Sequence, residues 1–175
     1  MAISVLVYDE FSKKMILQFK NGDCTYMAPQ FAMWMYRTAS NQLKDMDMII
    51  PVPMSLLKRI RRKYNQSELL AKQISKLANI PYEPDILYKR KGTRPQEGLT
   101  RGARLKNLSG AFDIYPKQAH LLQGKNIALI DDVITTGTTA NECARILKKH
   151  GAKKVMVVTI ARVTLEENVQ AMDEP

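Results

Sequence analysis

The spacing of apolar residues predicts two helices near the N-terminus. One covers residues 10–20 and the other residues 25–43, where Pro29 should either fall in the first turn, a position that tolerates proline, or break the helix. The apolar residues that share a face are Phe11, Met15, Ile16 and Phe19 in the first segment, and Met27, Phe31, Met33, Trp34 and Met35 in the second. Packing against a core is the commoner role of such methionine-rich faces. Positions 1–45 are therefore interpreted as a helical N-terminal extension, whose second helix is also a candidate contact between subunits of a homo-oligomer.

Shorter elements follow in the middle of the chain. Residues 47–50 are an apolar strand that ends at Pro51 and Pro53, because proline cannot donate to a central ladder. Residues 66–79 are amphipathic at helical spacing. The residues on their apolar face are Leu69, Leu70, Gln73, Ile74 and Leu77. The remaining candidates are a strand at 84–89, a glycine- and arginine-rich loop at 91–107, and a strand at 110–115.

The clearest pattern is a strand–helix–strand unit. Residues 126–132 form a continuous apolar strand that ends in two acids, and a turn and a helix to about Lys149 follow. Gly151 has the position expected after a helix, and residues 154–161 form a second buried strand. Two such strands joined by a helix are typical of a parallel sheet that is covered on both faces. The predicted fold class is therefore α/β, a parallel twisted sheet with helices on both faces.

Composition agrees with this fold and limits the cellular setting. The chain has 175 residues, of which 45% are hydrophobic and 25% charged, as in an ordinary globular protein. We expect a main domain at 46–165, between the 1–45 extension and a C-terminal tail at 166–175. No apolar run reaches eighteen residues, so we expect no membrane insertion, and the first residues lack the features of an export signal. Two cysteines, Cys24 and Cys143, fit a reduced cytoplasmic protein.

The positive charge of the chain is concentrated in one segment. Lys and Arg number 27 and Asp and Glu 17, for a net charge of +10. Between Lys58 and Lys106 there are fourteen basic and four acidic residues, so this segment alone accounts for the whole excess. Concentrated positive charge favours a polyanion or a phosphorylated small molecule as partner. The alternative is a solvated surface that only keeps the protein soluble.

The motif that carries chemistry follows the strand at 126–132. Asp131 and Asp132 emerge at its carboxyl end, where open α/β sheets place their ligands. The turn that leads into the next helix consists of Thr135, Thr136, Gly137, Thr138 and Thr139. Its backbone N–H groups and the helix dipole make an anion site, which glycine lets the main chain approach closely. Since carboxylates accept hydrogen bonds from hydroxyls and ligate Mg²⁺, a sugar phosphate fits both halves of the motif.

Two structural alternatives to this interpretation are weaker. A strand–turn–helix in which acids and threonines only cap the helix would need one residue of each kind, and this motif has more. A Walker A loop is excluded, because Gly124, Lys125 and Asn126 precede the strand instead of following it.

Residues 128–140 resemble the phosphoribosyl pyrophosphate (PRPP) signature of type I phosphoribosyltransferases, a hydrophobic strand with paired acids and a T-T-G-x-T loop. Over residues 47–162 the chain is similar to the competence protein F (ComF) branch of that superfamily. The matching pieces are residues 50–53, 62–70, 93–101, Arg104, Asn107, 110–112, Cys143 and Ala144, with a fainter match at 17–20. At position 63 this chain has Lys where the family commonly has glycine, and Tyr64 replaces phenylalanine.

The resemblance implies a role for each part of the site. Asp131 and Asp132 would hold the ribose 2′- and 3′-hydroxyls, directly or through Mg²⁺, and the 135–139 turn would cradle the 5′-phosphate. The turn implied to line the pyrophosphate consists of Val52, Pro53, Met54 and Ser55. The arginines implied to contact pyrophosphate oxygens, in a loop that resembles a flexible lid, are Arg94, Arg101 and Arg104.

The function implied is transfer of phosphoribose from PRPP to an acceptor, with pyrophosphate leaving. The transition state would be oxocarbenium-like, and Mg²⁺ and the arginines would stabilise the departing charge. By the same resemblance the biological role is natural competence and DNA uptake, with competence proteins as partners. Members of the family usually open with a four-cysteine zinc element; this chain has two cysteines, so no zinc is expected from it.

Two alternative functions stay open. A non-catalytic module could bind PRPP or a nucleotide while a basic segment grips single-stranded DNA through phosphate contacts and base stacking. The residues of that segment are Lys58, Arg59, Arg61, Arg62, Lys63 and Tyr64. The same segment also suits the rim of the pyrophosphate pocket. Base salvage is disfavoured, because residues 162–167 contain no aromatic to stack a base.

Overall fold

The computed structural model describes residues 1–21, 24–55, 60, 63–90 and 110–163. The strands are β1 (Ala2–Val7), β2 (Met48–Pro51), β3 (Leu87–Lys89), β4 (Phe112–Ile114), β5 (Asn126–Ile134) and β6 (Lys154–Arg162). The α-helices are α1 (Glu10–Asn21), α2 (Ala28–Leu43), α4 (Gln66–Ala78) and α6 (Thr138–Lys149), and the 3-10 helices are η1 (Thr25–Met27) and η2 (Pro116–Leu122).

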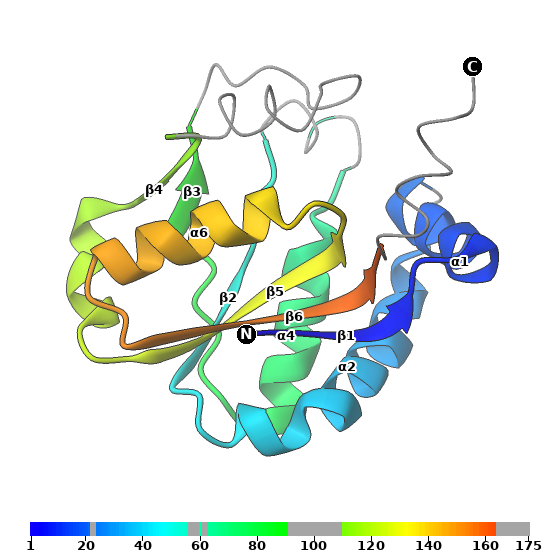
Figure 1. Ribbon diagram of the computed structural model, residues 1–175, viewed down its shortest axis with the longest axis horizontal. Coiled ribbons are helices and arrows are strands. Elements are labelled where there is room, and N and C mark those ends of the chain that lie inside the picture. The colour runs from blue at the N-terminus through cyan, green and yellow to red at the C-terminus, as the bar shows by residue number, and fades with distance from the viewer. Residues whose placement is uncertain (22–23, 56–59, 61–62, 91–109, 164–175) are drawn as a thin grey trace.

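A four-stranded sheet lies at the centre of the fold (Figure 1). Its order is β1-β6-β5-β2, and each neighbouring pair is parallel. In β5, the buried side chains of Ile127 and Leu129 face one core and those of Ala128 and Ile130 face the other, since successive residues of a strand point to opposite faces. The predicted α/β fold with a parallel sheet buried on both faces is confirmed.

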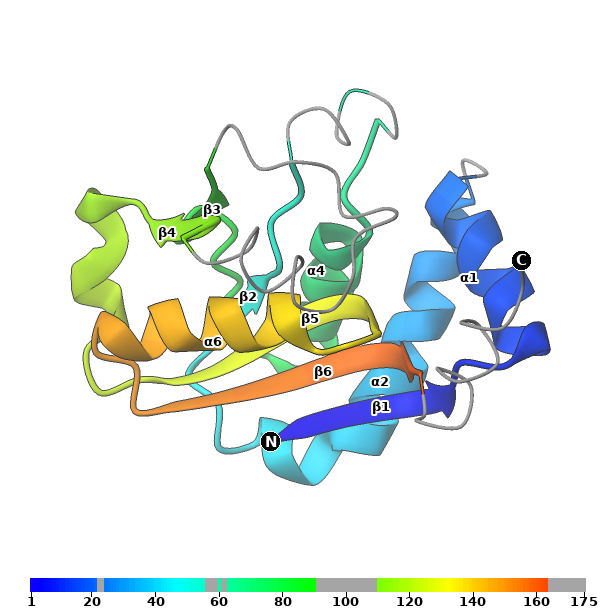
Figure 2. The ribbon, with the colours of Figure 1, turned by 45° about the horizontal axis from the view of Figure 1, so that its top comes forward.

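Helices cover both faces of this sheet. On one face, α6 and the small antiparallel pair β3–β4 share a core with the strands that contains Leu129 and Leu147. On the other face, α2 and α4 enclose a second core that contains Phe31, Ile74 and Ile130. Figures 1 and 2 show α6 on one side of the sheet and α2 and α4 on the other.

The N-terminal segment contains one element that the spacing did not predict. Ala2–Val7 forms β1, which pairs with β6 at the edge of the sheet. The segment has the period of two that a strand shows, in Ile3, Val5 and Val7, but six residues are a short signal beside two long helical patterns. The predicted helices are confirmed as α1 and α2, with Pro29 in the first turn of α2. The division of the chain near residues 45 and 165 stays a prediction.

The apolar face predicted for α1 is buried over only part of its length. The Phe11 side chain is 82% exposed, whereas Ile16 and Phe19 are fully buried. The C-terminal half of the helix makes the packing contact, and the rings of Phe19 and Phe31 lie 5.3 Å apart between centroids. Helical spacing identifies a face of a helix but not how far along that face the contact extends.

The helix α6 ends at Lys149, and Gly151 follows it as predicted. The Nδ1 atom of His150 lies 3.0 Å from the carbonyl oxygen of Ile146, so the side chain caps the last turn. Gly151 follows with a φ of +101°, a left-handed conformation that glycine adopts without strain.

Cys24 and Cys143 are both free thiols, and Cys143 is buried in α6. Within the described segments, the helices are too short or too polar to cross a bilayer.

Candidate functional site

Two described parts of the predicted site lie together at the carboxyl ends of two neighbouring strands. Asp131 and Asp132 belong to the last part of β5, and the 52–55 turn continues directly from β2. The two segments are adjacent, because the backbone N–H of Val52 donates to the carbonyl oxygen of Ile130 at 2.8 Å. The turn implied to line the pyrophosphate therefore lies beside the paired acids, although residues 56 to 130 separate them along the chain.

Asp131 points toward the start of α4. Its Oδ1 atom accepts hydrogen bonds from the Ser67 hydroxyl at 3.1 Å and from the backbone N–H of Asp132 at 2.9 Å. Burial raises the pKa of this carboxyl from 3.8 to about 7, and the charge of Asp132 adds to the increase. Near neutral pH the carboxyl therefore exchanges between a hydrogen-bond acceptor and a neutral acid that can also donate.

The raised pKa of Asp131 predicts a loss of stability with increasing pH. Between the ordinary pKa of 3.8 and the folded-state value of about 7, the folded protein binds more protons than the unfolded chain. The free energy of unfolding should therefore fall across this range and level off above it. Asp131→Asn should remove that component, on the order of 4 kcal/mol for a pKa raised from 3.8 to about 7. Urea unfolding at about pH 4 and pH 8 measures it; the same pH slope in Asp131→Asn and the native protein would contradict the assignment.

Asp132 has different partners. Its Oδ1 atom accepts from the backbone N–H of Val133 at 2.6 Å. Its Oδ2 atom lies 3.1 Å from the Nζ atom of Lys20 at the end of α1, an ion pair that is largely shielded from solvent. The two acids are thus held by groups from different helices, and Lys20 was not predicted as a site residue.

The threonine-rich turn has the geometry of an anion site. Gly137 is the N-cap of α6, with a φ of +73°, and it has no side chain to accept from the first-turn N–H groups. A Cβ atom there would meet nothing closer than 3.6 Å, so the glycine is favoured for its backbone conformation and not for lack of space. The hydroxyls of Thr136 and Thr138 lie 2.8 Å apart, and Thr135 is exposed. The free N–H groups at the start of α6 can therefore bind a phosphate.

Asn65 joins the 52–55 turn to α4. Its Oδ1 atom accepts from the backbone N–H of Ser67 at 3.1 Å and caps the helix. Its Nδ2 group donates to the carbonyl oxygen of Val52 at 3.1 Å. A single buried side chain therefore fixes the turn after β2, the start of α4 and, through Ser67, the position of Asp131. Asn65 and Ser67 lie in the segment that carries the family resemblance, but their roles were not predicted.

Lys63, just before this cap, has a φ of 65°. Left-handed backbone disfavours residues with a Cβ atom, whereas glycine adopts it without strain. Lys63→Gly should raise the free energy of unfolding by about 0.5–1 kcal/mol, because relief of strain outweighs the added freedom of the unfolded chain. Lys63→Ala is the control, since it removes the charge and keeps the Cβ atom. Denaturant unfolding in which the glycine variant is no more stable than the alanine variant would contradict this reading.

The basic segment is only partly described. Lys58, Arg59, Arg61 and Arg62 lie outside the described residues, as do the loop arginines Arg94, Arg101 and Arg104. Lys63 is exposed, and the hydroxyl of Tyr64 donates to the carbonyl oxygen of Phe19 at 3.0 Å. Tyr64 therefore anchors α1, a structural role beside the proposed stacking of bases. The contacts of the remaining basic residues stay predictions.

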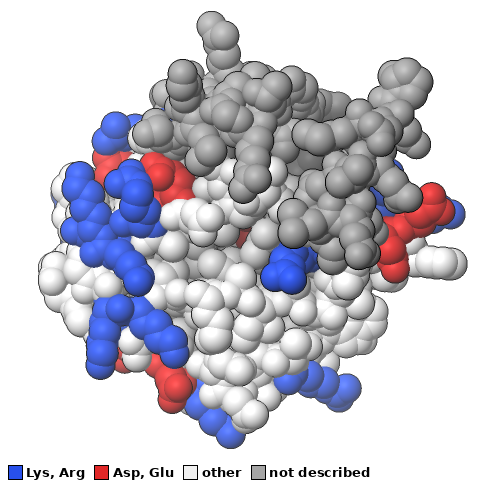
Figure 3. Space-filling model, in the orientation of Figure 1, with Lys and Arg blue, Asp and Glu red and all other residues white. Residues whose placement is uncertain are grey.

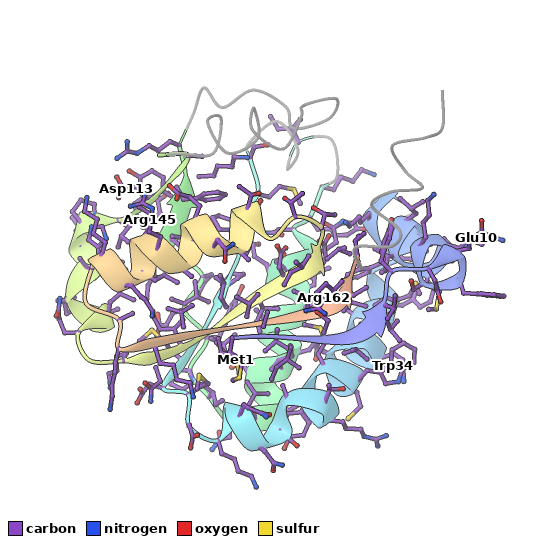
Figure 4. All side chains as sticks on the ribbon, viewed as in Figure 1. Met1, Glu10, Trp34, Asp113, Arg145 and Arg162 are labelled. Carbon is purple, nitrogen blue, oxygen red and sulfur yellow. The ribbon has the colours of Figure 1, made fainter. Side chains whose placement is uncertain are left out.

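Two arginines form ion pairs at a distance from Asp131 and Asp132. Figure 3 shows Lys and Arg side chains gathered over the end of α6 that is farther from the threonine turn. There Arg145 pairs with Glu142 at 2.8 Å, and Arg90 pairs with Asp113; Figure 4 shows the labelled Arg145 and Asp113 on this side of the molecule. These partners lower the pKa of Glu142 and of Asp113. The arrangement is that of surface ion pairs around the β3–β4 pair.

The donor set suits a metal that arrives with a ligand. Among the described residues, no group of three or more His, Cys, Asp or Glu side chains could hold a metal ion. The site offers two carboxylates, those of Asp131 and Asp132. Mg²⁺ is commonly bound by one or two carboxylates together with substrate phosphates and water, so these residues fit Mg²⁺ bound to a phosphorylated ligand.

Comparison with known proteins agrees with the motif. The sequence matches the phosphoribosyl transferase domain family over residues 40–172. It is 39% identical over 123 residues to competence protein F of Haemophilus influenzae, covering 70% of this chain and 53% of that protein. It is 33% identical over 126 residues to DNA utilization protein YhgH of Escherichia coli O157:H7, covering 72% and 53%. The resemblance to the competence protein F family is confirmed, and the chain spans about half the length of these relatives.

A solved structure supports the fold. The glutamine phosphoribosylpyrophosphate (PRPP) amidotransferase from B. subtilis is similar with a TM-score of 0.56 and 15% sequence identity. The match covers 81% of this chain and 30% of that one. At this identity the likeness concerns the fold alone.

Proposed function

The chain belongs to the phosphoribosyl transferase domain family, and from this we propose that its site binds PRPP together with Mg²⁺. One observation carries the proposal: the carboxylates of Asp131 and Asp132, the N-terminus of α6 at Gly137 and the 52–55 turn lie together at one end of the sheet. The carboxylates can accept hydrogen bonds from hydroxyl groups, and the helix N-terminus can bind an anion. Together they suit a ribose that carries phosphate groups.

Each part of the site has a defined task in this proposal. Asp131 and Asp132 accept hydrogen bonds from the ribose hydroxyls, and the first turn of α6 binds the 5′-phosphate. The 52–55 turn, held by Asn65, lines the pyrophosphate. Mg²⁺, when bound, supplies positive charge that offsets the pyrophosphate charge, and Asp131 and Asp132 would hold it together with phosphate oxygens.

We further propose that the protein transfers the phosphoribosyl group to an acceptor. A lone pair of the acceptor would form the new bond to the anomeric carbon, the bond to pyrophosphate would break with its electrons, and the acceptor would release a proton. The sugar becomes oxocarbenium-like, so carboxylates that hold its hydroxyls also stabilise the positive charge that develops. Arg94, Arg101 and Arg104 are the candidates to stabilise the leaving pyrophosphate.

Ligand binding is tested by thermal unfolding with and without PRPP and Mg²⁺. A ligand at one hundred times its Kd stabilises the folded state by about 2.7 kcal/mol, which should raise Tm by roughly 5–10 °C. Mg²⁺ with ribose 5-phosphate alone should give a smaller shift, because the pyrophosphate contacts are missing. If PRPP with Mg²⁺ leaves Tm unchanged, the site assignment fails.

Catalysis is distinguished from binding by release of pyrophosphate. A transferase should release pyrophosphate from PRPP faster than a protein-free control when bases, amines or single-stranded DNA are supplied. A thermal shift without such release would favour the alternative, a non-catalytic module that binds PRPP or a nucleotide.

A role in natural competence and DNA uptake is proposed from the relatives. Two of them are named competence protein F and DNA utilization protein. The concentration of basic residues between Lys58 and Lys106 supports contact with nucleic-acid phosphates, and affinity for a single strand should fall steeply with salt. Competence proteins are the expected partners, and a homo-oligomer remains a prediction.

A further inference from the structure

The second acid of the site is paired with a cation that lies before the phosphoribosyl transferase domain match. Lys20 belongs to the last turn of α1, whereas the match begins at residue 40. Its Nζ atom is 3.1 Å from Asp132 Oδ2, and the two side chains are 20% and 15% exposed. An ion pair so far removed from water interacts more strongly than an exposed surface pair.

The position of Lys20 is fixed by the fold and not by the ion pair alone. The side-chain amide of Gln66 donates to the carbonyl oxygen of Lys20 at 3.0 Å. The Tyr64 hydroxyl donates to the carbonyl oxygen of Phe19, whose ring is buried against Phe31. Figure 1 shows α1 at the end of the sheet toward which β1 and β6 point. The backbone that carries the ammonium group is therefore fastened to the start of α4, beside the acids.

Lys20 brings one positive charge to two adjacent carboxylates, and its Nζ atom contacts the second of them, Asp132. The cation thus offsets part of the negative charge that two adjacent carboxylates concentrate at this end of β5.

We infer that Lys20 is a positioning residue of the site, whose ammonium group takes the place beside Asp132 that a divalent cation would otherwise occupy. The inference rests on the proposed function, because it assumes that Asp131 and Asp132 face the bound PRPP. A free divalent cation must then displace Lys20 to reach Asp132. A metal that arrives on a phosphorylated ligand brings the ligand's own contacts, so the site favours metal and ligand together over metal alone.

The test is Mn²⁺ alone, a paramagnetic substitute for Mg²⁺, titrated into the full chain at low salt and followed by water-proton relaxation. Lys20→Met should bind Mn²⁺ about five- to tenfold more tightly than the native protein, because a positive charge next to the carboxylate is lost. Lys20→Arg should stay within twofold of native. Lys14→Met removes one charge from an exposed position of the same helix and should also stay within twofold.

Two further variants keep the test decisive. Asp132→Asn combined with Lys20→Met should abolish the gain, since the cation then has no carboxylate to bind. Lys20→Gln replaces Lys20→Met if the latter does not fold, with the same expected tightening. The inference is overturned if removal of the Lys20 charge tightens Mn²⁺ binding no more than Lys14→Met does. PRPP is absent from these titrations, so their failure and the failure of the PRPP thermal shift are separate results.

Discussion

Replacing Asp131 and Asp132 together with asparagine is expected to weaken binding of PRPP with Mg²⁺ by at least about 100-fold. Hydrogen bonds to charged acceptors contribute about 1.5–3 kcal/mol each, and the variant loses two such acceptors. Asparagine is close to aspartate in size, so the shape of the carboxyl end of β5 should persist. The thermal shift that PRPP and Mg²⁺ produce in the native protein should fall to below about 1 °C at the same ligand concentration.

The matched control is Asp45→Asn with Asp85→Asn, two exposed aspartates outside the site. That variant loses the same formal charge and should keep the native thermal shift. The assignment of the acid pair is contradicted if both double variants respond to PRPP alike. Unliganded Asp131→Asn alone should be at least as stable as the native protein near neutral pH, because burial makes the charged form of Asp131 costly. Asp132→Asn also removes the ion pair with Lys20 and should lower stability.

The second large effect concerns the N-terminal segment. Phe31→Ala should lower the free energy of unfolding by about 3–5 kcal/mol, the usual cost of removing a buried phenylalanine ring. Phe31 is 1% exposed and shares a core with α4 and the strands β5 and β6. The expected fall in Tm is roughly 6–20 °C for a chain of this length. Denaturant unfolding followed by far-UV circular dichroism measures it.

Phe11→Ala is the control for the same side chain. Phe11 is 82% exposed, so its removal should change the free energy of unfolding by less than about 0.5 kcal/mol. If residues 1–45 were a separate extension, Phe31→Ala would leave a second, unperturbed transition for the rest of the chain. A single transition shifted as a whole means that α2 folds as part of the sheet domain.

Where a local pattern was long, the fold could be predicted. The continuous apolar runs of β5 and β6, with the amphipathic α6 between them, specified a buried parallel unit, and the helices α1, α2 and α4 followed from their periodicity. β1 was not predicted, because an alternating pattern over six residues is too short to stand out beside the longer helical patterns that follow it. The exposure of Phe11 could not be predicted, because periodicity does not show where a neighbouring element ends.

The candidate site also has a part that a local pattern predicts and a part that it does not. The acid pair and the threonine turn are contiguous, so one stretch of backbone places them, and the motif could be read directly. Ser67 lies 64 residues from the Asp131 carboxylate that it bonds, and no local signal links the two. Lys20 is a basic residue in the last turn of a helix, where its interaction with the helix dipole already explains its presence. The sequence therefore offered no reason to place it in the site.

The sequence by itself determined the α/β class and the contiguous acid–turn–helix motif, because alternation, helical spacing and glycine conformation are local properties of the chain. The tertiary structure alone decided which groups surround the acids: the Ser67 hydroxyl, the Asn65 amide that holds the 52–55 turn, and the Lys20 ammonium group. Those contacts depend on how α1 and α4 pack against the ends of β2 and β5. Such packing is set by the fit of buried side chains over the whole core, which no short segment encodes.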